Sequence, residues 1–97
     1  MKTLSEIREI LRTHADELRS RYGLTNLAVF GSVVRGESTE GSDVDILAEL
    51  EFPIGLIALV SAENCLTDLL GVKVDLVLKR SVRRELREQI LSEAVAV

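Results

Sequence analysis

The feature that most constrains this chain is the alternation of amphipathic helical segments with short apolar strands. In the first segment Leu4, Ile7, Leu11, His14 and Leu18 recur at spacings of three and four, which places them on one face of a helix. The same reading predicts helices over residues 3–22, 53–70 and from 81 onward, and strands over residues 27–30, 43–50 and 73–78. Because helices in such an order cover a sheet, we expect an α/β fold of α+β-like character, with a small mixed sheet of about three strands flanked by helices.

Several residues predict where these helices begin and end. Thr3 followed by Glu6 fits a capping box, and Gly23 fits a helix stop. Pro53 suits the first turn of a helix, where its missing N–H does no harm, so we expect the second helix to begin there. Ser81 is a favourable N-cap, and we expect it to cap the last helix. The second helix should present a broad apolar face made of Leu56, Ile57, Leu59, Val60, Leu66, Leu69 and Leu70.

Length and composition limit the classes of protein that fit. A chain of 97 residues has room for a single domain spanning residues 1–97. The net charge of −4 and the aromatic content of 3% argue against direct nucleic-acid binding, which needs clustered excess Lys and Arg or stacking rings. Cys65 is the only cysteine, so no intrachain disulfide can form. The longest apolar run, residues 57–60, is too short to span a bilayer, and residues 2–9 are polar, so we expect a cytoplasmic protein that binds no membrane.

Asp43 and Asp45 form an acidic pair at the start of the second expected strand. Residues two apart in a strand point to the same face, so both carboxylates face one way while Val44 and Ile46 face the core. The two like charges repel each other, and away from water they are tolerable if one carboxyl is protonated or a cation lies between them. An oxygen-only donor set suits Mg²⁺ or Mn²⁺. The alternative is an ordinary pair of solvated aspartates, which is common by chance.

Gly31 and Ser32 follow the first expected strand. Glycine lets the backbone approach a ligand closely, and a turn beginning at Ser32 offers N–H groups and a hydroxyl to a phosphate. Arg35, three residues on, would project from roughly the same side of that turn. An ordinary turn with a capping serine is the alternative. If the two strands are antiparallel neighbours, this turn and the acidic pair lie close together.

These residues together carry a resemblance to a known family. The pattern GSxxRG over residues 31–36, followed by SDxDIL over residues 42–47, resembles the signature of the DNA polymerase β-like nucleotidyltransferase superfamily. The short spacing and the chain length resemble its smallest branch, the minimal nucleotidyltransferases (MNT). Asp75, within the strand-like segment 74–77, is similar to the third acid of that family. The resemblance implies the polymerase β-like nucleotidyltransferase fold.

The resemblance also implies roles for individual residues. Asp43, Asp45 and Asp75 would be the catalytic acids and would hold two divalent metal ions, Mg²⁺ or Mn²⁺. Asp75 would accept the proton of the attacking hydroxyl. Gly31, Ser32 and Arg35 would bind the triphosphate of ATP, the expected substrate.

The resemblance finally implies a biological partner. MNT proteins resemble the antitoxins of HEPN–MNT toxin–antitoxin pairs, in which the enzyme transfers AMP from ATP to a tyrosine of a HEPN-type RNase toxin. Two alternatives stay open: an antitoxin that neutralises its partner by binding alone, and a transferase for small molecules such as aminoglycosides. The basic cluster of residues 79–87 and the last helix are the candidate docking surface, and the apolar segment 94–97 would pack on the sheet or contact another chain. Whether the protein forms homo- or hetero-oligomers stays open.

Overall fold

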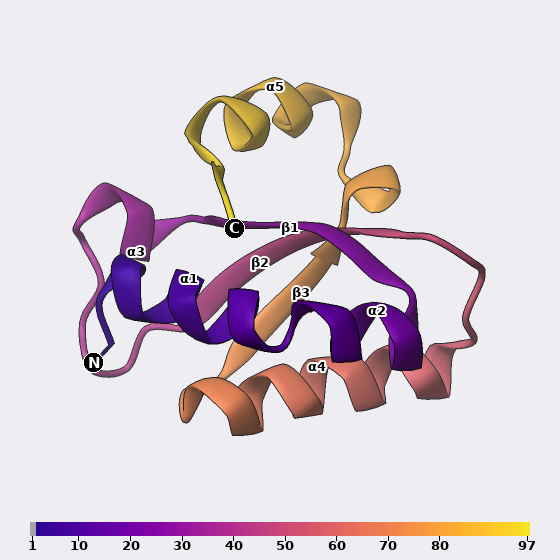
Figure 1. Ribbon diagram of the computed structural model, residues 1–97. Coiled ribbons are helices and arrows are strands. Elements are labelled where there is room, and N and C mark those ends of the chain that lie inside the picture. Colours follow the sequence, from indigo (N-terminus) through magenta and orange to yellow (C-terminus); the bar gives the residue numbers. More distant parts are fainter. Residues whose placement is uncertain (1) are drawn as a thin grey trace.

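A four-stranded mixed sheet runs through the middle of the protein, as the computed structural model shows (Figure 1), and the structure describes residues 2–97. The strands are β1 Leu24–Phe30, β2 Val44–Leu50, β3 Val74–Leu78 and β4 Val95–Ala96. They lie in the order β3-β2-β1-β4, with β2 antiparallel to β1 and parallel to β3. The expected mixed sheet flanked by helices is confirmed, and the structure adds a short fourth strand to the three that the sequence predicts. The fourth strand comes from the apolar segment 94–97, which pairs antiparallel with β1 through Ala28–Ala96 and Val29–Val95.

The core lies between one face of the sheet and three helices. The helices are α1 Leu4–Thr13, α2 Ala15–Tyr22 and α4 Leu56–Leu70, all on the same side of the sheet (Figure 1). Aliphatic side chains of the helices meet alternate residues of the central strands there, and the fully buried ones include Ile7, Leu11, Leu18, Val29, Val44, Ile46, Leu66 and Leu70. Burial of these side chains is the main source of stability for a chain this small.

The first helical segment is divided in two, so the expected continuous helix over residues 3–22 is wrong at His14. This residue has φ −103° and ψ 7°, ends α1 and begins α2. The buried leucines on either side, Leu11 and Leu18, both keep to the core across the break. The expected ends are confirmed: Thr3 and Glu6 form a complete capping box, and Gly23 closes α2 with a φ of 73°.

α4 begins later than the sequence predicts. Its N-cap is Gly55, whereas Pro53 lies in the connection that carries the chain from β2 to the helix. The expected broad apolar face is also too wide. Leu56 and Ile57 in the first turn are 75% and 86% exposed, because that turn lies beyond the part of the helix that contacts the core.

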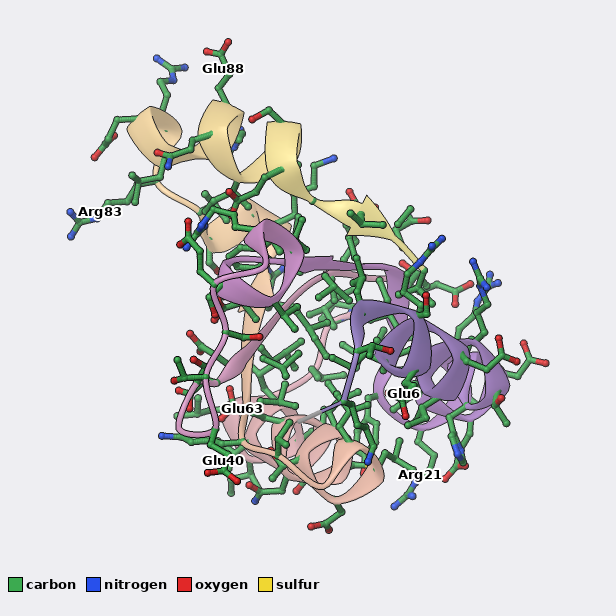
Figure 2. All side chains as sticks on the ribbon, turned by 90° about the vertical axis from the view of Figure 1, so that its left-hand side faces the viewer. Glu6, Arg21, Glu40, Glu63, Arg83 and Glu88 are labelled. Atoms are coloured by element: carbon green, nitrogen blue, oxygen red, sulfur yellow. The ribbon has the colours of Figure 1, made fainter. Side chains whose placement is uncertain are left out.

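The last helix, α5 Arg84–Glu93, lies over the opposite face of the sheet (Figure 1). Its N-cap is Arg83, so the expected cap Ser81 is wrong; Ser81 instead ends a short 3₁₀ turn, η1 Lys79–Ser81. No residue of α5 is fully buried, and Arg83 and Glu88 point away from the rest of the protein (Figure 2). None of the helices in residues 2–97 combines the length and the apolar character needed to cross a membrane.

Candidate active site

The strand register brings two of the predicted acids together. Asp45 on β2 lies opposite Phe30 on β1 and opposite Asp75 on β3. Since successive side chains alternate between the faces of a sheet, the buried neighbours Val44 and Ile46 point into the core and Asp45 points to the other face. Asp75 holds the equivalent position on the adjacent strand. The two carboxylates therefore share the face of the sheet that α1, α2 and α4 leave uncovered.

Gly31, which precedes the turn after β1, lies directly against the carboxylate of Asp45. It has φ 82° and ψ −154°, a backbone conformation that residues with a Cβ atom rarely adopt. A Cβ atom at this position would lie 2.1 Å from Oδ2 of Asp45. The residue must therefore be glycine for two reasons, its backbone conformation and the position of the Asp45 carboxylate. The expected closeness of turn and acids, joined by one loop between antiparallel strands, is confirmed.

The turn itself is a single helical turn, α3 Ser32–Arg35. The carbonyl oxygen of Gly31 accepts hydrogen bonds from the N–H groups of Val34 and Arg35, at 3.1 and 3.2 Å. Val33 is buried and anchors the turn, whereas the Ser32 side chain is half-buried and that of Arg35 is largely exposed. Ser32 and Arg35 are therefore held at the start and the end of a turn that packs against Asp45.

Asp43 lies just outside this arrangement. It is exposed and precedes β2, which begins at Val44 rather than at the expected residue 43. In the described part of the chain, no three His, Cys, Asp or Glu side chains are grouped closely enough to hold one metal ion. The strand register thus brings Asp45 and Asp75 together, whereas Asp43 lies at the end of the preceding loop, just before β2.

The electrostatics of Asp45 reflect this crowding. Partial burial, followed by the negative charges of Asp75 and Asp43, raises the pKa of the Asp45 carboxyl, and the nearby Arg35 opposes the rise. A divalent cation between such carboxylates would remove the repulsion. The donors are all carboxylate oxygens, with no thiol or imidazole among them, which is the set that Mg²⁺ and Mn²⁺ prefer.

Sequence reasoning missed one residue of the site, Glu93 in the last turn of α5. Its Oε1 accepts a hydrogen bond of 2.9 Å from the N–H of Gly31, and both carboxylate oxygens lie 3.1 Å from Nη1 of Arg35. A local signal could not have found it, because 62 residues separate it from Gly31. Through the Glu93 side chain, α5 contacts the turn at residues 31–35, although the helix lies near the C-terminus.

The basic cluster predicted over residues 79–87 lies elsewhere. A cavity of about 520 Å³ at the end of β2 away from Asp45 is lined by Lys79, Arg80 and Arg87 together with Glu49 and strand residues. Nζ of Lys79 pairs with Glu49 at 3.4 Å. The cluster thus lies toward the end of β2 away from Asp45.

Comparison with known proteins identifies the family. The nucleotidyltransferase domain family matches residues 11–97. The protein adenylyltransferase MntA of Thermococcus cleftensis is 46% identical over 97 residues, which cover 100% of this chain and 98% of the relative.

Solved structures agree with the sequence relatives. The structure of a minimal nucleotidyltransferase superposes with a TM-score of 0.81 at 38% identity, covering 99% of this chain and 97% of that one. A toxin–antitoxin structure with AMP-PNP superposes with a TM-score of 0.70 at 26% identity, covering 87% of this chain and 69% of that one. The chain, which carries Asp45 and Asp75 beside its Gly31–Ser32 turn, thus belongs to the minimal nucleotidyltransferase family, and its relatives include the protein adenylyltransferase MntA.

Proposed function

We propose that this nucleotidyltransferase transfers AMP from ATP to a tyrosine hydroxyl of a HEPN-type toxin and thereby acts as its antitoxin. One observation carries the proposal: Asp45 and Asp75 lie in register on adjacent strands, directly beside the Gly31–Ser32 turn. The sequence identity of 46% to the protein adenylyltransferase MntA, over the whole length of this chain, supports adenylyl transfer to a protein.

We assign the metal site to Asp45 and Asp75, which lie in register on adjacent strands, together with Asp43, which would have to move toward them from the loop before β2. These carboxylates would hold Mg²⁺, with two ions expected and Mn²⁺ an acceptable replacement. The mutual repulsion of these carboxylates supports the assignment, because a cation relieves it. When bound, such ions neutralise the triphosphate and lower the pKa of the attacking hydroxyl. Asp75, the most accessible acid on the strands, accepts the proton of that hydroxyl.

Ser32 and Arg35 position the triphosphate in this scheme. The Ser32 hydroxyl donates to a phosphate oxygen, and the Arg35 guanidinium supplies positive charge on the same turn. The hydroxyl oxygen then forms a bond to the α-phosphorus of ATP, and the bond from that phosphorus to the oxygen shared with the β-phosphate breaks. Pyrophosphate leaves with the bonding pair. Catalysis comes mainly from positioning and charge neutralisation.

The acceptor comes from outside this chain in our proposal. The likeness to a toxin–antitoxin structure that holds AMP-PNP supports a toxin and a nucleotide as the two ligands. We assign docking to α5 and the basic cluster at residues 79–87, because Leu86 and Leu91 are 47% and 42% exposed although they are large and apolar. The complex of the two chains is expected in the cytoplasm.

The test is to incubate the protein with ATP, Mg²⁺ and the product of the neighbouring gene as candidate HEPN-type toxin, and to measure that toxin by mass spectrometry. We expect the toxin mass to rise by one or more AMP units and toxin activity to fall. The Asp43→Asn/Asp45→Asn variant should still bind the toxin without modifying it. Full protection of cells by that variant, with no mass shift on the toxin, would replace this proposal with neutralisation by binding.

A further inference from the structure

Glu93 links α5 to the turn Ser32–Arg35 and to Gly31 just before it. No residue of α5 is fully buried, whereas the Glu93 side chain is only 20% exposed. Its carboxylate contacts two donors at once, the N–H of Gly31 and Nη1 of Arg35. Hydrogen bonds to a charged group are shorter and stronger than neutral ones, and low exposure limits their screening by water.

Arg35 is held from two sides. Its Nε donates to Glu37 at 3.2 Å and its Nη1 donates to both oxygens of Glu93 at 3.1 Å. The guanidinium is planar, so fixing Nε and Nη1 also fixes the direction of the remaining nitrogen, Nη2. Arg35 thus keeps one nitrogen, Nη2, for an anion while Nε and Nη1 bind the two carboxylates.

We propose that Glu93 is a positioning residue for nucleotide binding, which holds the guanidinium of Arg35 and the peptide of Gly31 in the orientation that receives the triphosphate of ATP. The inference rests on the proposed function, since it concerns the same site. The energetic reason is preorganisation: a flexible arginine on an exposed turn loses side-chain entropy when it binds phosphate, and Glu93 has already restricted it.

The same contact gives α5 a part in nucleotide binding. Gly31 packs against Asp45, so a shift of its peptide moves the turn relative to the acids. A partner that docks on α5 acts on this turn through Glu93. Nucleotide affinity is therefore coupled to the position of α5.

The experiment measures the dissociation constant of ATP with Mg²⁺ by calorimetry, and KM for ATP, in the wild type and its variants. Glu93→Gln keeps the size of the side chain and removes the charge, and we expect about tenfold weaker ATP binding because a charge-assisted contact is lost. Glu88→Gln, on the exposed side of the same helix, is the matched control in calorimetry without toxin, where it should bind ATP as the wild type does. In an Arg35→Ala background, Glu93→Gln should change the affinity by less than it does in the wild type, because only the contact with the N–H of Gly31 remains to be lost.

Glu93→Asp is a second variant that tests geometry without removing charge. One methylene shorter, it withdraws the carboxylate from both donors, and we expect a loss similar to that of Glu93→Gln. Tighter ATP binding by Glu93→Gln, or an equal loss with and without Arg35, would overturn the positioning role. A wild-type protein that does not bind ATP would instead refute the proposed function itself, so the two failures are distinguishable.

Discussion

Replacing Gly31 with alanine tests the central contact of the site. The new Cβ would lie 2.1 Å from Oδ2 of Asp45, whereas ordinary contact begins at 3.4 Å, so the carboxylate or the turn must move by at least about 1.3 Å. The backbone at φ 82° and ψ −154° adds a strain of about 1–3 kcal/mol. With the displacement of a half-buried side chain added, we expect a total loss of about 2–4 kcal/mol in the free energy of unfolding.

The effect on catalysis should exceed the effect on stability. A displacement of about 1 Å at a reacting group can lower the rate about 100-fold, so we expect Gly31→Ala to transfer AMP about 100 times more slowly. Thermal denaturation and a transfer assay with ATP and Mg²⁺ measure the two effects.

Gly36→Ala is the matched control, because Gly36 also has a positive φ, 72°, and a Cβ added there would meet no neighbouring atom within 4 Å. It should cost about 1 kcal/mol from the backbone alone and keep most of the transfer rate. Equal losses for Gly31→Ala and Gly36→Ala, in both stability and rate, would refute the argument that the Asp45 contact matters.

Three further changes test other parts of the structure. The pKa of Asp45 is raised by burial and by its acidic neighbours, so the metal-free protein loses stability as the pH rises from about 4, the unfolded value. Asp45→Asn in EDTA should therefore raise the melting temperature at neutral pH, and an unchanged melting temperature would contradict the argument that burial and carboxylate repulsion destabilise the charged Asp45. Ser32→Ala should raise KM for ATP about fivefold, since one neutral hydrogen bond is worth about 1 kcal/mol, and a loss as large as that of Asp45→Asn would give Ser32 another role. Thr3→Ala should lower stability by about 1 kcal/mol through loss of the capping box while leaving transfer unchanged, and Ser5→Ala is its control.

Much of the site could be predicted because its residues lie close together in the sequence. Gly31, Ser32 and Arg35 occupy one turn, and the loop to Asp45 joins two antiparallel strands. Local pattern and strand periodicity are sufficient to place such residues on one side of a sheet. Asp75 needed the family resemblance as well, because a single acid on a strand is usually only solvated.

The features that the sequence analysis missed or predicted wrongly depend on contacts between segments that are distant in the sequence. Glu93 reaches Gly31 only because α5 crosses the outer face of the sheet, and no local pattern encodes that path. The break at His14 and the exposed Leu56 and Ile57 have the same origin: helical periodicity marks an apolar face but does not say how much of it the sheet can cover. The two-residue strand β4 is shorter than any alternation that could have identified it.

β4 also covers part of an edge of the sheet that could otherwise pair with another copy of the protein. An unpaired strand edge is a template for intermolecular pairing, and β4 occupies part of the free edge of β1. Nε of Arg8 and Nε of Arg12, both from α1, donate to the carbonyl oxygens of Ala96 and Val97 at 3.1 and 2.8 Å, so the first helix holds the last strand in place. We therefore expect self-association to begin with local opening of segment 94–97 rather than with global unfolding. Amide hydrogen exchange in β4 should then track the onset of aggregation.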